Sequence, residues 1–400
     1  MSFDPAEAAR RYRAANAETL RWMLDRPPLG PGFLNTKVHS LTLREYGDDD
    51  GLRGPRFTYG WIQGRGLEAL CTHAAVLPAG DPPAWRMDAA ARRLYRLLDD
   101  LRARDGHGYF CYDADLRPVI AAEPVRPQNT PADIWTYTDA FWAKGLVAAA
   151  ARFAPEDLPR QLAYLAEVVE AIRAGRFQMD ERVPLSVAAL TAQPNDFGPR
   201  MILLGACPLL RRIGRAEEAA FGREFLRDVL DRHGELATGL LRDTPGQPGC
   251  NPGHAIELVG FALEDGTLAA PPMAERLTQV LTASFRAGFD GTGIALSVDA
   301  RTGEALNPLR PWWSLPEAIR AASLAHAATG DPDAFSIWEK ADHAFFAHYW
   351  REGTGIAIQT RGPDGPVDHV PATPDLDPGY HTGLSLLAAA EAADHLQGVS

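Results

Sequence analysis

The sequence predicts an all-α protein whose helices form an (α/α)6 barrel, with short β-hairpins in the loops at one end. Three observations support this fold class. Helical periodicity covers twelve segments, these segments occur in pairs joined by short turns such as Gly330–Asp331, and short strand-like stretches recur between the pairs. No linker or low-complexity stretch divides the chain, so we expect a single domain over residues 1–400. A superhelical solenoid would use the same helix pairs and is the alternative architecture.

The predicted helices begin where the sequence offers helix start signals. Asp81-Pro82-Pro83 and Asp331-Pro332 each place an acidic residue before proline, which suits the N-cap and the first turn. Within each segment the apolar residues recur at helical spacing. The predicted helices cover residues 4–25, 62–77, 82–104, 131–154, 156–175, 198–213, 215–231, 253–264, 271–288, 313–329, 331–349 and 379–396.

Three stretches between the helix pairs have strand character. Residues 108–112 and 116–120 flank an Asp-Ala-Asp turn, residues 293–299 precede Gly303, and residues 355–359 precede residues 364–367. Short apolar runs around turn-forming residues predict β-hairpins. In a closed ring of helix pairs, the inner helix ends and these loops surround one deep central pit, which is the expected place for a ligand.

Bulk composition excludes several classes of partner. The formal net charge is −12 and no basic cluster appears, which argues against a nucleic-acid partner. No window approaches the roughly 20 apolar residues that span a bilayer. Residues 1–5 have neither the basic start nor the apolar segment of a signal peptide, so we expect a cytoplasmic location and no membrane association. Small residues on the outer helices would permit a homodimer. The four cysteines lie far apart and are expected to be free buried thiols: Cys71, Cys111, Cys207 and Cys250.

Two histidines begin predicted helices after Pro- and Gly-containing turns. His254 follows Pro252-Gly253 and precedes an apolar run at helical spacing, with Glu257 three residues on and on the same face. His381 has the same kind of position near the C-terminus. An imidazole beside a carboxylate can act as an acid or a base near neutral pH, so both histidines are candidate catalytic residues that could face one substrate carbon. The alternative is that each histidine only caps or packs a helix.

Two clusters combine aromatic rings with an arginine or a glutamate. The first holds Tyr59, Trp61 and Arg65, and the second holds Trp312, Trp313 and Glu317. Such rings suit a pyranose face, and a guanidinium can hold sugar hydroxyls or stabilise a developing oxyanion. The alternatives are a surface arginine and core tryptophans.

Metal and cofactor patterns are missing from the sequence. It contains no His-x-Glu-x-x-His, no Gly-x-Gly-x-x-Gly, no phosphate-binding loop and no Gly-x-Ser-x-Gly. We therefore expect no metal and no cofactor.

The order of four motifs resembles the N-acylglucosamine 2-epimerase superfamily, which includes cellobiose 2-epimerases and mannose isomerases. The motifs are Trp-x-Gln-Gly-Arg at residues 61–65, Pro-Gly-His-x-x-Glu at 252–257, Trp-Trp-x-x-x-Glu-Ala at 312–318 and Tyr-His-x-x-x-Ser/Ala-Leu at 380–386, within a match over residues 55–395. The resemblance implies an (α/α)6-barrel catalytic domain. It also implies two histidines that move a proton through a cis-enediol or enediolate of a sugar, without a metal or a redox cofactor.

The resemblance assigns a role to each matched residue. His254 and His381 match the two general acid/bases, Glu257 matches the carboxylate that accompanies the first, and Arg65 matches an arginine near sugar O1 and O2. The segment with Trp312 or Trp313 and Glu317 matches one that contacts the sugar. The helix with Asp133, Tyr137 and Phe141 matches a pocket-lining aromatic helix.

Three positions depart from the family's pattern. Ile202 and Gly205 stand where the family has His and Glu, and Gly260 stands where a tryptophan often follows the second motif. Arg200 could supply the missing polar contact. These differences concern the substrate-binding residues rather than the acid/base pair.

The expected activity is that of a sugar 2-epimerase or an aldose–ketose isomerase acting on a free monosaccharide or a reducing-end sugar. Return of the proton to the opposite face of C2 gives the epimer, and delivery to C1 gives the ketose, so the same residues serve both outcomes. One alternative is a glycoside hydrolase or lyase on the same barrel that uses Glu257 and Glu317 as its two carboxylates. Another is a sugar-binding barrel without catalytic activity.

Overall fold

The computed structural model describes residues 3–78, 81–129 and 131–398, which are mostly helical, as predicted for an all-α protein. The chain divides into two compact units. Unit 1 comprises Met1–Leu20, Asn195–Pro371 and His381–Ser400, and unit 2 comprises Arg21–Pro194 and Ala372–Tyr380. The single domain over residues 1–400 stays a prediction.

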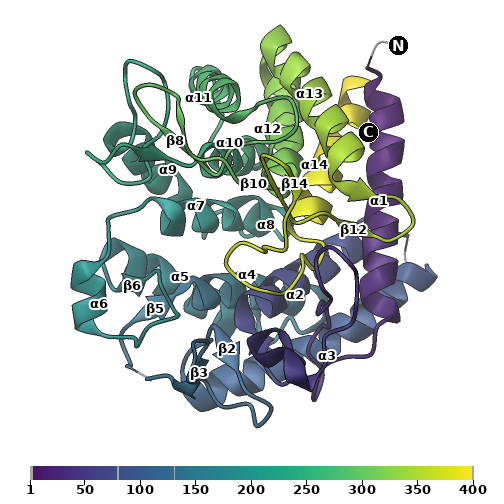
Figure 1. The fold of residues 1–400 in the computed structure, drawn as a ribbon, viewed down its shortest axis with the longest axis vertical. Coiled ribbons are helices and arrows are strands. Elements are labelled where there is room, and N and C mark those ends of the chain that lie inside the picture. The colour runs from purple at the N-terminus through teal and green to yellow at the C-terminus, as the bar shows by residue number, and fades with distance from the viewer. Residues whose placement is uncertain (1–2, 79–80, 130, 399–400) are drawn as a thin grey trace. The chain divides into compact units, whose positions relative to one another are not determined.

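The longer helices of unit 2 include two inner and two outer ones, which are labelled in Figure 1. Helices α2 (Gly60–Ala75) and α4 (Tyr137–Phe153) pack against each other and are buried on nearly all sides. Helices α3 (Pro82–Asp105) and α5 (Leu158–Arg173) bury one face and expose charged residues on the other, which is the pattern of an outer helix.

Two glycines allow α2 and α4 to approach closely. A Cβ on Gly64 would lie 2.7 Å from the carbonyl carbon of Phe141, and a Cβ on Gly145 would lie 2.6 Å from the carbonyl oxygen of Gly64. Any larger residue at either position would therefore push the two inner helices apart.

The connecting segments of unit 2 carry three short strand pairs. β1 (Thr58–Tyr59) pairs antiparallel with β2 (Cys111–Tyr112), β3 (Val119–Ile120) pairs antiparallel with β4 (Arg126–Pro127), and β5 (Trp135–Thr136) pairs parallel with β6 (Phe177–Gln178). The predicted hairpin over residues 108–120 is therefore wrong in its main pairing. Its two strands share one bridge, Tyr112 to Pro118, and each pairs mainly with another segment.

Unit 1 also has buried inner helices and amphipathic outer ones. Helix α12 (Ser314–Thr329) packs against both α10 (Pro252–Asp265) and α14 (His381–Leu396), and all three are almost fully buried. The helices with one exposed face are α9 (Phe221–Arg232), α11 (Met273–Gly288), α13 (Pro332–His348) and α1 (Pro5–Asp25), whose last residues belong to unit 2. Two short helices, α7 (Gly198–Leu204) and α8 (Ala206–Arg212), pack against α10.

Short strands of unit 1 form three small sheets. β8 (Ser297–Asp299) pairs antiparallel with β7 (Gly249–Cys250) and with β9 (Ala305–Asn307), so the predicted hairpin around Gly303 is confirmed. The predicted hairpin of residues 355–359 with 364–367 is wrong. β12 (Ile356–Ala357) pairs with the preceding β11 (Trp350–Arg351), while β13 (Thr360–Gly362) pairs with β14 (Gly365–Pro366) and with β10 (Arg310–Pro311).

Helix boundaries differ from the prediction in three places. The helix predicted over 131–154 begins at Tyr137, because β5 precedes it and Thr136 forms a capping box with Asp139. The helix predicted over 198–213 is broken at Gly205, and the helix predicted over 215–231 begins at Phe221. Two short helices have no predicted counterpart, η1 (Asp48–Arg53) and α6 (Val187–Ala192).

Two smaller predictions concern the cysteines and the membrane. All four cysteines are buried thiols, as predicted. Within the described ranges, every helix is too short or too polar to cross a bilayer.

Candidate functional site

His254 lies in the first turn of α10, as the turn before it predicts. Asn251 is the N-cap residue, and its side-chain oxygen accepts the backbone N–H of His254 at 3.2 Å. The backbone N–H of Asn251 is in turn donated to Asp243 Oδ1 at 2.8 Å. These bonds fix the helix start, and with it the Cα position of His254.

One indole ring contacts both predicted catalytic histidines. The Trp313 ring stacks on the His254 imidazole with centroids 5.4 Å apart, and it lies 5.6 Å from the His381 imidazole. A Cβ on Gly253 would lie 2.6 Å from Trp313 Cη2, so the glycine before His254 makes room for the indole. The three rings belong to unit 1, and they bring together histidines that are far apart in the sequence.

His381 is the first residue of α14 and faces two buried carboxylates. Its Nδ1 lies 2.9 Å from Glu317 Oε1 and 3.8 Å from Glu257 Oε1. Both glutamates are 1% exposed. Glu317 also forms an ion pair with Arg320, one helical turn further along α12, and this arginine is 3% exposed. The result is a charged cluster that water barely reaches.

The charge state of Glu317 fixes which nitrogen of His381 carries a proton. Burial alone would raise the pKa of Glu317, but the positive charge of Arg320 and the hydrogen bond to His381 outweigh burial and lower that pKa. Glu317 is therefore a carboxylate, which only accepts hydrogen bonds, so Nδ1 of His381 must donate. Nε2 then keeps its lone pair when the ring is neutral and is the nitrogen available as a base.

The two glutamates make contacts that the sequence did not predict. Glu257 was expected to accompany His254, which stays a prediction, and its Oε1 lies 3.8 Å from His381 Nδ1. Glu317 was expected to touch the sugar, which also stays a prediction, and its oxygens are engaged by His381 and Arg320. The geometry therefore indicates that Glu317 orients His381, a role that the sequence did not suggest.

Gly260, one of the departures from the family's pattern, makes space for Arg320. A Cβ on Gly260 would lie 2.9 Å from Arg320 Nε. The guanidinium carbon lies 4.3 Å from the Phe261 ring centroid, and Nη1 is 3.5 Å from Glu264 Oε2. A buried arginine that pairs with Glu317 thus uses the room that Gly260 leaves.

Unit 2 holds Arg65 among aromatic rings. Its guanidinium carbon lies 4.1 Å from the Phe141 centroid, 5.4 Å from that of Trp61 and 5.6 Å from that of Tyr380. Tyr137 meets Trp61 edge-on with centroids 5.3 Å apart. Arg65, Trp61 and Tyr137 therefore form one cluster of contacting side chains, and Arg65 is a guanidinium stacked on rings rather than a lone surface charge.

A buried lysine joins this cluster and was missed from the sequence. Lys144 is fully buried in α4, its Nζ donates to Tyr380 Oη at 2.5 Å, and it lies 3.2 Å from Glu68 Oε2. A lysine within an otherwise apolar, alanine-rich helix is costly unless it is paired, and that was the available signal. Tyr380 directly precedes His381 in the chain.

Two further residues that were predicted to bind substrate have partners within the protein. Tyr59 is 2% exposed, donates its hydroxyl to the Leu52 carbonyl at 3.0 Å and packs in a cluster of buried apolar side chains. The Arg200 Nε is engaged by Asp228 Oδ2 at 2.8 Å. A substrate-binding role for either residue stays a prediction.

The buried cluster also has the composition of a metal-binding triad. Glu257, Glu317 and His381 each offer a ligand atom, and these atoms lie within 4.8 Å of one another. However, Glu317 Oε1 accepts from His381 Nδ1 and its Oε2 accepts from Arg320, so hydrogen bonds already engage both oxygens of Glu317 and one nitrogen of His381. The donor set favours proton chemistry over metal binding.

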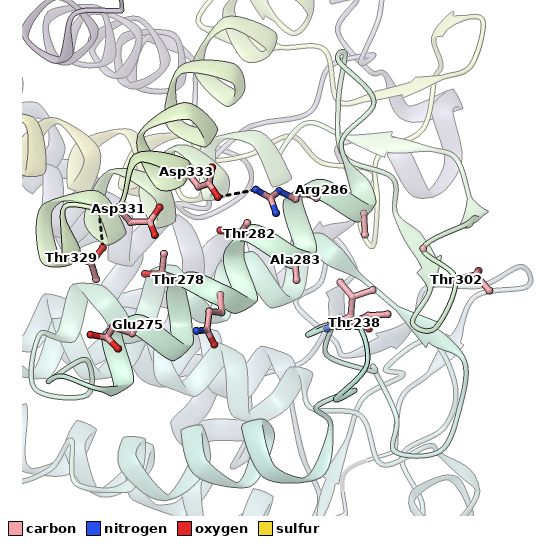
Figure 2. Close-up of a pocket in the computed structure, with 14 residues that line it drawn as sticks. Thr238, Glu275, Thr278, Thr282, Ala283, Arg286, Thr302, Thr329, Asp331 and Asp333 are labelled. Carbon is pink, nitrogen blue, oxygen red and sulfur yellow. Dashed lines mark hydrogen bonds and ion pairs between the residues drawn. The ribbon is translucent and has the colours of Figure 1, made fainter.

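A polar groove of about 740 Å³ lies apart from the histidines, along α11 and the start of α13 (Figure 2). Figure 2 shows Thr278, Thr282 and Arg286 of α11 facing Asp333, to which Arg286 is bonded. Aromatic rings are not among the residues that line this groove. It therefore offers no stacking surface for a sugar and is not the candidate site.

Comparison with known proteins gives a structural likeness without a sequence match. No protein-family model matches the chain. No curated protein matches it. Among solved structures, a cellobiose 2-epimerase from Bacillus thermoamylovorans B4167 is 14% identical with a TM-score of 0.73, and the alignment covers 96% of this chain and 98% of that one. A sugar epimerase from a ruminal bacterium is 16% identical with a TM-score of 0.71, covering 98% and 99%. A D-mannose isomerase is 13% identical with a TM-score of 0.68, covering 96% and 97%. The likeness shows that the predicted (α/α)6-barrel fold is correct.

Proposed function

We propose that this protein belongs to the N-acylglucosamine 2-epimerase superfamily and is a sugar 2-epimerase or aldose–ketose isomerase. Its substrate would be a free monosaccharide or the reducing end of a short saccharide. The observation that carries the proposal is the contact of one indole, Trp313, with both His254 and His381. The structural neighbours that are themselves epimerases and a mannose isomerase support it.

The proposed reaction starts from the ring-opened aldose. C2 next to the aldehyde is a weak carbon acid, so its deprotonation needs a positioned base and a donor for the oxygen that gains charge. Nε2 of His381 is suited to the base role, because Nδ1 is committed to Glu317. His254 is then the partner that protonates the enediolate from its other face, which yields the C2 epimer. Delivery of a proton to C1 yields the ketose.

We assign the positive charge in this scheme to Arg65, as the resemblance implies. Its guanidinium would stabilise the enediolate oxygens, and the rings of Trp61 and Phe141 hold it by stacking. Charge stabilisation of this kind is strongest where water is excluded, and three aromatic rings around one guanidinium provide that environment.

Proton NMR in D2O tests the proposal directly. The purified protein is incubated with glucose, mannose, N-acetylglucosamine and cellobiose, each separately. Loss of the C2–H signal with appearance of an epimer or a ketose is the expected result. If every C2–H signal persists over a long incubation with folded protein, the chain is a binding protein or acts on another class of compound.

The geometry argues against the glycosidase alternative. Glu257 and Glu317 are both 1% exposed, and both approach the same nitrogen of His381. A glycosidase instead places its two carboxylates on either side of a scissile bond, about 5–9.5 Å apart. Release of a free sugar from a glycoside panel, without exchange at C2, would revive this alternative.

A further inference from the structure

Another buried carboxyl group, that of Glu181 in unit 2, has no role in the mechanism above. Glu181 follows β6 and is 3% exposed. Its Oε1 accepts from Thr138 Oγ1 at 2.6 Å, and its Oε2 accepts from Trp61 Nε1 at 2.5 Å. Thr138 lies in the first turn of α4 and Trp61 in the first turn of α2, so one carboxyl group bridges the starts of the two inner helices.

The bond to Glu181 determines how the Trp61 ring is turned. The indole N–H only donates, and Glu181 is the acceptor that holds it. The ring is half-buried, and it contacts Tyr137, Phe141 and the guanidinium of Arg65. Because a tryptophan ring has a broad second torsion angle, loss of this hydrogen bond would free the ring to rotate away from Arg65.

We propose that Glu181 is a positioning residue of the sugar site, which holds Trp61 so that its indole forms a binding surface beside Arg65. The proposal rests on the proposed function, in which Arg65 faces the substrate. Glu181 is too deeply buried to touch the sugar and acts only through the indole. Its removal should therefore weaken sugar binding and leave the chemical step nearly intact.

The ionisation of Glu181 provides a readout that a merely structural residue would not give. The pKa of Glu181 is raised to about 8, mainly by burial. Hydrogen bonds from Thr138, Thr136 and Trp61 oppose this increase, and the negative charge of Asp139 on α4 adds to it. From α2, Arg65 contacts the ring that Glu181 holds. The carboxyl group is thus neutral at pH 7 and becomes charged as the pH passes through 8, when its bond to the indole becomes charge-assisted and stronger.

The test compares Glu181→Gln with the wild-type chain between pH 6.5 and 9.5. Glutamine keeps the shape and an accepting oxygen but cannot ionise. In the wild type we expect the dissociation constant for mannose or cellobiose, measured by calorimetry, to fall about threefold to tenfold as the pH rises through 8. In Glu181→Gln this step disappears, while kcat stays within about twofold of the wild type at pH 7. Glu391→Gln on α14, which removes an exposed carboxyl group that pairs with Arg212, is the control and should keep the step.

Tryptophan fluorescence supplies a readout that needs no sugar. Wild-type emission should change with a midpoint near pH 8, and the change should vanish in both Glu181→Gln and Trp61→Phe. A transition that persists in Glu181→Gln, or a binding step unaffected by that substitution, would overturn the proposal. Failure of the proposed function looks different: sugars would bind with the step at pH 8 but would exchange no proton at C2.

Discussion

The substitution Glu317→Gln separates the catalytic role of the buried cluster from its structural one. It removes one negative charge from between His381 and Arg320 and keeps the side-chain size. A hydrogen bond with a charged partner contributes about 1.5–3 kcal/mol. If that bond keeps the proton on Nδ1 during turnover, kcat should fall about 10-fold to 150-fold, because each 1.4 kcal/mol is about a factor of ten in rate. The assay is the rate of C2–H exchange in D2O with the best substrate of the panel.

The same substitution also leaves Arg320 buried without its main partner. Breaking a buried ion pair by removing one member costs about 3–5 kcal/mol. Glu264 lies 3.5 Å from the Arg320 guanidinium and keeps part of the pairing, so a loss of about 3 kcal/mol in the free energy of unfolding is expected. Urea unfolding at pH 7 measures it.

The pH dependence of this stability difference has a definite sign. The pKa of Glu317 is lowered on folding, so the unfolded chain binds more protons there. The stabilisation from its charge is therefore complete above the ordinary glutamate pKa of 4.5 and is lost as the pH falls through the lowered value. The difference between wild type and Glu317→Gln should shrink in acid.

A double variant distinguishes the two effects. Glu317→Gln with Arg320→Met removes both charges, so it should recover most of the lost stability while kcat remains low. If kcat returns together with stability, Glu317 acts only by supporting the fold and the reasoning about Nδ1 is refuted. A normal kcat in Glu317→Gln alone would refute it as well.

Two further substitutions test the packing around the proposed site. Gly260→Ala puts a Cβ 2.9 Å from Arg320 Nε and should lower the free energy of unfolding by about 1–3 kcal/mol. Gly47→Ala is the control, because a Cβ at Gly47 meets no atom within 4 Å. Equal effects of the two substitutions in urea unfolding would contradict the close approach of Gly260 to Arg320. Tyr380→Phe removes the acceptor of the Lys144 hydrogen bond and should lower the free energy of unfolding by about 1–3 kcal/mol, measured by urea unfolding. An unchanged free energy of unfolding would argue against that bond.

The periodic spacing of apolar residues predicted most of the helices correctly. The inner and outer helices, the start of α10 just before His254 and that of α14 at His381 follow from apolar spacing and from turn residues, which act locally. Interruptions within the predicted helices were harder to predict. Gly205 separates α7 from α8 within one predicted helix. A glycine weakens a helix, but the sequence alone does not show whether the helix ends there. Strands of two residues have no periodicity at all, so the partners of β2 and β12 depend on which segments the helices bring close.

The contacts between charged residues of the candidate site could not be predicted from local sequence. Glu317 and His381 are 64 positions apart, and their bond depends on how α12 packs against α14. Arg320 and Lys144 each stand in an apolar helical segment, which signals a buried charge but does not name its partner. Tyr59 packs in a cluster of buried apolar side chains, and its role in a sugar site stays a prediction.

The central claim is that two imidazoles from distant segments act on one sugar carbon. His254→Asn and His381→Asn retain a polar side chain of similar shape but cannot accept and return a proton. Deuterium uptake at C2, followed by NMR with circular dichroism as a check of folding, should fall by at least about 10²-fold in each variant. Uptake at the wild-type rate by either folded variant would contradict the account.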